Sequence, residues 1–295
     1  HLNGSLYLMV LPVVAFYILF HYLPMSGVII AFKNYKPAKG VFGSAWAGMG
    51  GFQHFHDFFT NFYFYRTLRN TLLINLYTLL FGFPAPIVFA LLLNEVKCRP
   101  FKRAVQTVSY FPHFISLVVV CGMLTEFCLS DGLFNQIRAL FGLSPKPLLQ
   151  DPLLFRTIYV SSGVWQTVGW SSIVYLAAIA GIDQGLYEAA ALDGAGRWRC
   201  MWHITLPGLK QTVVVLLIMQ IGKMMNVSAD KIILLYNNST METADVISSY
   251  VYRRGLLELS WSFSTAVGLF NSVINCALVV GANAMSRRLT ESSLF

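Results

Sequence analysis

Long hydrophobic runs alternate with shorter polar segments along the whole chain. Six runs, at residues 6–31, 71–93, 104–129, 158–182, 212–235 and 263–284, are long enough or nearly long enough to cross a membrane. A helix needs about 20 predominantly apolar residues to span the roughly 30 Å of hydrocarbon in a bilayer. The pattern therefore predicts an all-α polytopic membrane protein with about six transmembrane helices.

Prolines interrupt several of these runs, at Pro12 and Pro24 in the first, Pro84 and Pro86 in the second and Pro112 in the third. A proline inside a span frees a backbone carbonyl, which is tolerated only where protein or water satisfies it again. The prolines therefore favour a transport path over a simple anchor. Beyond Pro24, we expect the first run either to leave the membrane or to bend along it.

Composition supports the membrane class. Of the 295 residues, 56% are hydrophobic and only 12% are charged, and the mean hydropathy is +0.60. The formal net charge of +8 would fit nucleic acid, but basic residues in so apolar a chain more often contact anionic lipid headgroups and set topology. We therefore expect membrane lipids, and no nucleic acid, as partners. None of the five cysteines looks like a disulfide partner, because three lie in hydrophobic runs and two beside basic loops.

The polar stretch 188–209, between the fourth and fifth runs, can form a compact element of its own. Three successive alanines favour a helix, Gly194 and Gly196 break it, and Pro207 suits the first turn of the next helix. Trp198 and Trp202 are four residues apart, so they share one face of that second helix. The stretch predicts a helix, a turn and a helix that together suit a docking groove.

The spacing within this stretch resembles the EAA loop of ABC importer permeases. Glu-Ala-Ala is followed by a glycine six residues after the glutamate, then by nine residues and Ile-x-Leu-Pro. The resemblance implies a cytoplasmic coupling loop, at residues 183–210, that inserts into an ATP-hydrolysing partner. The coupling residues that it implies are Glu188, Ala189, Ala190, Asp193, Gly194, Ala195, Trp198, Trp202, Ile204, Leu206 and Pro207. The alternative is an ordinary interfacial helix pair between two membrane spans.

Lysine and arginine give a weak topology signal. With the amino terminus inside, the basic residues of the cytoplasmic loops are compact, above all at 97–103, whereas those of the outer loops are spread over longer segments. The EAA resemblance favours the same orientation. It places Cys98 and Cys200 in the cytoplasm.

The segment 33–69, between the first two runs, contains five glycines followed by a dense run of aromatic residues. Aromatic residues at this density are typical of the water–lipid interface. His54, His56 and Asp57 could be read as a metal cluster, but no further ligand follows at a recognisable spacing. We therefore expect an interfacial helix here and no metal site.

Further segments resemble the polysaccharide-type branch of these permeases, to which alginate-importer permeases belong. They are residues 21–25, 29–37, 235–237, 245–247 and 250–253 and the C-terminal stretch 287–295. One departure is Ser-Ala-Asp-Lys at 228–231, where the branch is expected to have a Gly-Phe start and an uncharged last residue. The chain begins at His1 instead of methionine, and we expect residues before it.

The resemblance covers nearly the whole chain and implies a single transmembrane permease domain, 1–295, in the bacterial cytoplasmic (inner) membrane. The partners that it implies are a second, homologous permease subunit in a heterodimer, two ATPase subunits, an extracytoplasmic solute-binding protein and an oligosaccharide. It implies no cofactor on this chain, because ATP and Mg belong to the ATPase subunits. The sequence agrees, since it contains no G-x-x-x-x-G-K-[ST] phosphate loop.

Polar side chains inside the predicted spans are candidates for a substrate path, because ionisable groups are costly in hydrocarbon. In the fifth run, Lys223, Asn226 and Asp230 share one helix face, which either lines a hydrated path or holds helices together. Aromatic faces and amides suit sugars. The candidates are Trp165, Gln166, Trp170, Gln220, Lys223, Asn226, Asp230, Asn271 and Asn275. Any single one of them is more often a packing residue than a ligand.

Residues and resemblance together predict the permease subunit of an ATP-driven type I ABC importer for oligosaccharides or polysaccharide fragments, alginate among them, with no catalytic residue. The alternative is a membrane-embedded enzyme acting on lipid-linked sugar, with a carboxylate such as Glu126 or Asp230 facing solvent. No H-E-x-x-H, G-x-S-x-G or C-x-x-C motif supports an enzyme.

Overall fold

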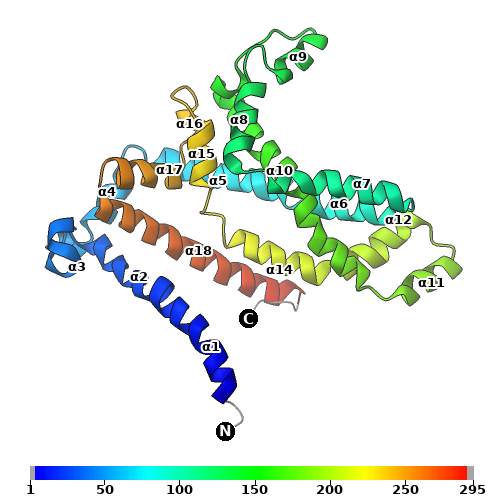
Figure 1. Cartoon of the computed structure of the whole chain (residues 1–295), viewed down its shortest axis with the longest axis horizontal. Coiled ribbons are helices and arrows are strands. Elements are labelled where there is room, and N and C mark those ends of the chain that lie inside the picture. Colours follow the sequence, from blue (N-terminus) through cyan, green and yellow to red (C-terminus); the bar gives the residue numbers. More distant parts are fainter. Residues whose placement is uncertain (1–3, 291–295) are drawn as a thin grey trace. The chain divides into compact units, whose positions relative to one another are not determined.

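A computed structural model describes residues 4–290 of the chain (Figure 1). Over this range the chain is helical, with no strand and one isolated antiparallel bridge between Lys33 and Trp46, which confirms the all-α prediction. Residues 291–295, the end of the C-terminal stretch compared above, lie outside the described residues. The helices form two compact units. One comprises Tyr250–Val273 and the chain up to Phe64, and the other comprises Tyr65–Ser249 and the chain from Ile274.

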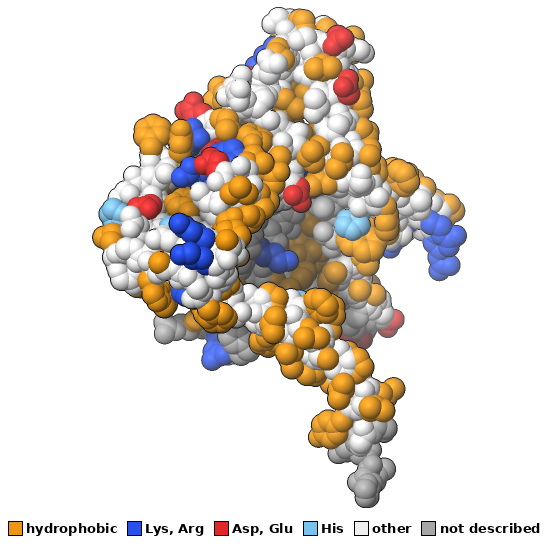
Figure 2. Space-filling model, turned by 60° about the vertical axis from the view of Figure 1, so that its left-hand side comes forward, with side chains coloured by type: hydrophobic (Ala, Val, Ile, Leu, Met, Phe, Trp, Pro, Cys, Tyr) orange, Lys and Arg blue, Asp and Glu red, His pale blue; other side chains and the backbone are white. Residues whose placement is uncertain are grey.

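The first unit begins with an unbroken helical run over the first predicted span. The run consists of α1 (Gly4–Tyr17), the π-helical η1 (Ile18–Tyr22), α2 (Leu23–Met25) and the 3-10 helix η2 (Ser26–Phe32). Tyr7–Phe32 is long and apolar enough to cross a membrane, and its side chains are almost all exposed (Figure 2). The π-helical turn ends two residues before Pro24, and its widened backbone accommodates the ring and the missing N–H. After Pro24 the helix continues in the tighter 3-10 geometry.

The segment after the first span contains a short helix at the predicted place, α4 (Gln53–Phe59). Phe58 is buried, with Phe263 and Phe270 at ring-centroid distances of 6.1 and 5.5 Å. The His54 ring lies 3.2 Å from the Lys33 carbonyl oxygen, so this histidine fastens the loop. No group of three His, Cys, Asp or Glu side chains that could hold a metal ion occurs within residues 4–290.

The remaining helices of the first unit are short, apart from one that continues into the second unit. They are η3 (Pro37–Lys39), α3 (Gly40–Gly43), η4 (Met49–Gly51), the end of α17 (Ile247–Tyr252), η9 (Arg253–Leu257) and the start of α18 (Trp261–Thr290).

The second unit is organised around α10 (Pro152–Ala180), the fourth predicted span. This helix packs against η5 (Thr78–Gly82), α6 (Pro84–Glu95), α7 (Arg99–Tyr110) and α16 (Met241–Ala244). Asp151 caps this helix by accepting a 2.9 Å hydrogen bond from the Leu153 N–H. The ammonium of Lys146, 2.6 Å from the Asp151 carboxylate, holds the pKa of that carboxyl below its usual range. Because Asp-Pro is a strong start signal, the helix begins at residue 152, before the hydrophobic run at 158.

The other helices of this unit follow in chain order. They are α5 (Phe64–Tyr77), η5 (Thr78–Gly82), α6 (Pro84–Glu95), α7 (Arg99–Tyr110), η6 (Phe111–Phe114), α8 (Leu117–Phe127), α9 (Leu133–Leu140), η7 (Leu148–Gln150), α11 (Gln184–Leu192), α12 (Arg197–Cys200), η8 (Met201–Thr205), α13 (Leu206–Gly208), α14 (Lys210–Ile221), α15 (Ala229–Leu235) and α16 (Met241–Ala244).

A close helix crossing fixes the packing of α10 on α7, and a buried polar network joins α5 to the segment before α17. At the crossing with α7, a Cβ on Gly169 would meet the Ser109 carbonyl oxygen at 2.2 Å, so only glycine allows this approach. In the network, the fully buried Asp245 accepts a 2.8 Å bond from Arg66 of α5, and Asn70 donates to the Asp245 carbonyl oxygen at 2.9 Å. These bonds join segments that are far apart in the sequence.

Two predicted spans differ from single straight helices. The third is a pair, Arg99–Phe114 and Leu117–Phe127, bent by 99° just after the turn that contains Pro112. The fifth ends as α14 at Ile221, and a non-helical link, 222–228, precedes α15. By length and composition, three helices of the described chain qualify as membrane spans, or up to five if each bent pair counts as one. The number six stays a prediction.

Candidate functional site

The stretch predicted to be the coupling loop, residues 183–210, has the expected order of helix, turn and helix. α11 begins at the cap Asp183, which accepts a 2.9 Å bond from the Gly185 N–H. At its end, Gly194 has a φ of +73°, its N–H bonds the Ala191 carbonyl, and the Ala195 N–H bonds the Ala190 carbonyl at 2.8 Å. These two hydrogen bonds form a Schellman turn, which favours glycine at the left-handed position.

A second helical run, 197–208, follows this turn. α12 passes at Met201 into the π-helical η8, and Pro207 lies in the first turn of α13, as predicted. The Tyr187 hydroxyl lies 2.9 Å from the Thr205 hydroxyl, which ties α11 to this run. The Arg197 Nε lies 3.9 Å from a carboxylate oxygen of Glu95, at the end of α6. The two runs and the turn between them, residues 184–208, are called the elbow below.

The elbow presents large apolar side chains to its surroundings. Leu192, Trp198 and Trp202 are 90%, 70% and 60% exposed. Of the implied coupling residues, Ala190, Ala195, Ile204 and Leu206 are half-buried, and the other seven are exposed. Large apolar groups exposed together in this way are typical of a surface that another protein covers.

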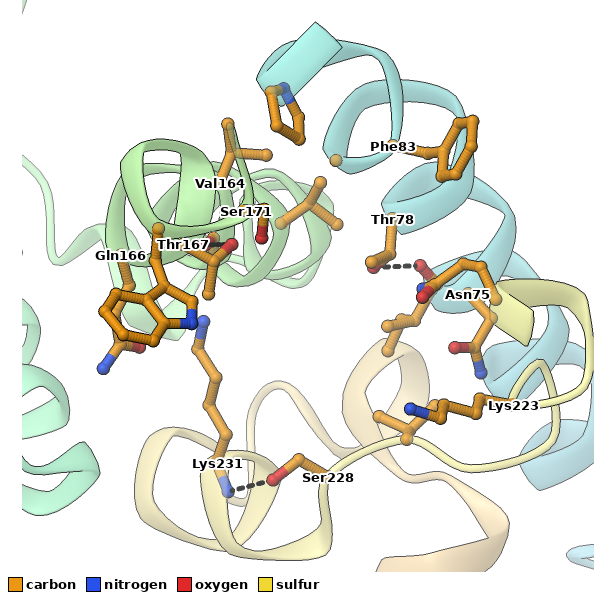
Figure 3. Close-up of a pocket in the computed structure, with 18 of the residues that line it drawn as sticks. Asn75, Thr78, Phe83, Val164, Gln166, Thr167, Ser171, Lys223, Ser228 and Lys231 are labelled. Carbon is orange, nitrogen blue, oxygen red and sulfur yellow. Dashed lines mark hydrogen bonds between the residues drawn. The ribbon is translucent and has the colours of Figure 1, made fainter. Parts of the chain in front are cut away.

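The second unit also contains a cavity of about 690 Å³ (Figure 3). Its wall is formed by the α5–α6 segment, by the middle of α10 from Tyr159 to Tyr175, by α14 with the link that follows it, and by one residue each of α8 and α15, Leu117 and Lys231. Polar groups in the wall include Asn75, Thr78, Gln166, Thr167, Ser171, Gln220, Lys223, Asn226, Ser228 and Lys231. Trp170, Phe83 and two tyrosines supply aromatic surface. The cavity thus combines hydrogen-bonding side chains with aromatic faces, which is the chemistry that sugars need.

Five of the nine path candidates line this cavity, and four do not. Those in the wall are Gln166, Trp170, Gln220, Lys223 and Asn226. Trp165, Asp230, Asn271 and Asn275 lie outside it, and Asn271 belongs to the other unit.

The expectation of one helical stripe in the fifth span was wrong. Gln220 is on α14, Lys223 and Asn226 are in the non-helical link, and Asp230 is on α15. Asn275 of α18 holds the link open as an irregular segment, because its side chain accepts from the Met225 N–H at 3.0 Å and donates to the Asn226 side chain at 3.1 Å. Tertiary hydrogen bonds replace the helical ones here.

Of the two lysines in the cavity wall, Lys231 is the one that the sequence pattern did not single out as a site. The only signal was the charged departure at 228–231, which was noted as a difference from the sugar branch. In the structure Lys231 is 6% exposed, and its ammonium donates to the Tyr159 carbonyl oxygen at 2.9 Å. Asp230, one residue earlier, is exposed and outside the cavity.

A model of the family described as "Binding-protein-dependent transport system inner membrane component" matches residues 62–291. The chain belongs to this family. It is therefore a multi-pass membrane component of an ABC importer that works with a binding protein, as the sequence predicted.

Full-length relatives agree with this assignment. "Protein LplB" and "Polygalacturonan/rhamnogalacturonan transport system permease protein YteP", both of Bacillus subtilis (strain 168), are each 43% identical over 291 residues. The two alignments cover 98% of this chain and 91% and 90% of the relatives.

A solved structure shows the same fold. A chain in the crystal structure of a bacterial ABC transporter involved in the import of the acidic polysaccharide alginate matches with a TM-score of 0.90 and 43% identity. The match covers 98% of this chain and 96% of that one. The alginate transporter in complex with an alginate pentasaccharide-bound periplasmic protein gives a TM-score of 0.91 at the same identity.

These likenesses confirm the prediction of a permease and not an enzyme, because the family is a transport system component and YteP is named a transport system permease. They give no support to an enzyme acting on lipid-linked sugar. Glu126 and Asp230, the carboxylates considered for that role, are exposed and lie outside the cavity wall.

Proposed function

We propose that this permease forms one half of a permease pair that imports oligosaccharides or polysaccharide fragments across the bacterial cytoplasmic membrane. A second, homologous permease completes the pair, two ATPase subunits bind below it, and an extracytoplasmic binding protein delivers the sugar. ATP and Mg are bound by the ATPase subunits. The polygalacturonan and rhamnogalacturonan in the name of YteP, and the alginate in the titles of the solved structures, support this substrate class.

One observation carries the proposal: a single helix, α10, carries part of the cavity wall and leads directly into the elbow. Its 29 residues extend about 43 Å at 1.5 Å per residue. It contributes cavity residues from Tyr159 to Tyr175 and ends at Ala180, three residues before the cap of α11. A rigid helix of this kind transmits a displacement of the elbow to the cavity.

The mechanism follows from this connection. Closure of the ATPase subunits pushes the elbow, and α10 and α14, which flank the elbow in the chain, tilt together. Because both helices line the cavity, the tilt opens it alternately to the two sides of the membrane. The break at 222–228 gives the α14 side of the wall a point at which it can bend.

The test is reconstitution of the complete transporter with its genomic neighbours, measuring co-purification of the ATPase and its stimulation by the sugar-loaded binding protein. Leu192→Glu, at the tip of the elbow, should abolish both, since a charge replaces an apolar side chain that is 90% exposed. Leu140→Glu, on α9 before the start of α10, is the matched control because Leu140 is 84% exposed. ATPase binding that survives Leu192→Glu unchanged would refute the docking role of the elbow.

A further inference from the structure

The cavity contains a buried ammonium group that is held by neutral groups. Lys231 lies in the first turn of α15, where its N–H donates to the capping Ser228 hydroxyl at 3.4 Å. Its side chain extends from there toward α10, and the ammonium lies 4.6 Å from the centre of the Tyr159 ring and 2.9 Å from the Tyr159 carbonyl oxygen. A Cβ on Gly163 would lie 3.4 Å from the ammonium, so the missing side chain at 163 leaves room for it.

No carboxylate compensates this charge. Within residues 4–290, no Asp or Glu oxygen lies within 4.0 Å of the Lys231 ammonium, and the cavity wall contains no acidic residue. Burying a charge is costly unless it is paired, and a carbonyl dipole with a ring face offsets only part of that cost. Of the three N–H groups of the ammonium, one is used by the Tyr159 carbonyl, so two remain as donors to a ligand.

A second ammonium faces the same space. Lys223, in the link after α14, lines the cavity and is exposed, and no carboxylate of the described chain lies within 4.0 Å of it. Figure 3 shows the two lysine side chains reaching into the cavity from different sides. The wall thus carries two positive charges and no negative one, next to amides and an indole ring.

We propose that this cavity selects acidic oligosaccharides, and that Lys231 is the specificity-determining residue that binds a sugar carboxylate. The proposal rests on the function proposed above and names the substrate class within it. A carboxylate accepts charge-assisted hydrogen bonds, which are about twice as strong as neutral ones, and it neutralises the buried ammonium. A neutral sugar supplies hydroxyls but leaves the charge uncompensated. Lys223 contributes less, because water screens an exposed charge.

The decisive variants separate the charge of Lys231 from its hydrogen bond. Lys231→Gln removes the charge but keeps an N–H that can donate to the Tyr159 carbonyl, whereas Lys231→Arg keeps the charge. The assay is ATP-driven uptake by proteoliposomes that contain the complete transporter and its binding protein, normalised to folded permease. The substrates are a labelled hexuronate oligosaccharide and its methyl ester, which has the same backbone and no charge.

We expect Lys231→Gln to lower uptake of the acidic oligosaccharide by about tenfold or more, since hydrogen bonds to charged groups are stronger than those between neutral groups. Uptake of the methyl ester should change less than about twofold, and Lys231→Arg should retain most of the acidic uptake. If the binding protein does not deliver the ester, the proposal is tested by comparing uptake of the acidic oligosaccharide between Lys231→Gln and Lys231→Arg. Equal loss in both variants, or equal loss of both sugars, would make Lys231 a structural tie and overturn the proposal.

Lys33 provides a matched control in the other unit. It is also 6% exposed, its ammonium donates to the Val41 carbonyl at 3.0 Å, and it lies 5.1 Å from the centre of the Trp46 ring. Lys33→Gln should therefore lower the yield of folded protein without changing the ratio of acidic to ester uptake.

Wild-type uptake of neutral oligosaccharides alone would refute the acidic substrate class. No wild-type uptake of any oligosaccharide would refute the proposed function instead.

Discussion

The turn of the elbow gives a quantitative prediction, because Gly194 is held in a left-handed conformation with open space around it. Its φ is +73°, and an added Cβ would meet no atom within 4 Å. A substitution there therefore acts through backbone strain and not through a clash. A residue with a side chain pays about 1–2 kcal/mol in this conformation, and a β-branched residue lies at the upper end. Gly194→Val thus disfavours the observed turn by about 2 kcal/mol, a factor of roughly 30.

The assay is ATPase activity of the reconstituted complex with and without sugar-loaded binding protein. We expect Gly194→Val to remain in the membrane in folded form, because Gly194 is exposed, and to lose most of the stimulation. Gly194→Ala should be intermediate. Gly194→Asn should be close to wild type, since asparagine tolerates the left-handed conformation best after glycine.

The test lies in how the three variants rank by their loss of ATPase stimulation. Stimulation equal to wild type in Gly194→Val would show that coupling does not need this turn. Loss in Gly194→Asn as large as in Gly194→Val would show that the side chain itself, and not the backbone conformation, disturbs a bound partner.

Three further outcomes follow from the packing and the exposed cysteines. Gly169→Ala should destabilise the protein by about 1–3 kcal/mol in thermal unfolding, since its methyl group would meet the α7 backbone at 2.2 Å; Gly122→Ala, with no atom within 4 Å of its Cβ, should be neutral. Asp245→Asn removes the buried carboxylate that accepts a hydrogen bond from Arg66 of α5, and it should lower stability by about 3 kcal/mol. An unchanged melting temperature would contradict a stabilising role of this ion pair. A membrane-impermeant thiol reagent should label Cys98, which is exposed, and more slowly the half-buried Cys200, only after cells are permeabilised; external labelling of Cys200 would invert the topology.

The sequence by itself determined the features that depend on local chemistry. Hydrophobic runs located the long helices, because desolvation acts on each segment separately. The elbow could be predicted because its turn is closed by hydrogen bonds between residues only three to five positions apart, with Gly194 as the conformational requirement. The short helix after the first span, α4, could also be predicted from a local feature, which is the density of aromatic residues in that segment.

Only the tertiary structure decided the cavity. The fifth span reads as one continuous hydrophobic helix, but Asn275, 49 positions beyond Asn226, satisfies the link and allows it to unwind. Lys231 became a site residue because its ammonium meets Tyr159, 72 positions away. The third span bends by 99°, which its hydropathy does not reveal. Periodicity describes a segment in isolation, whereas these side chains acquire their roles from neighbours that are remote in the sequence.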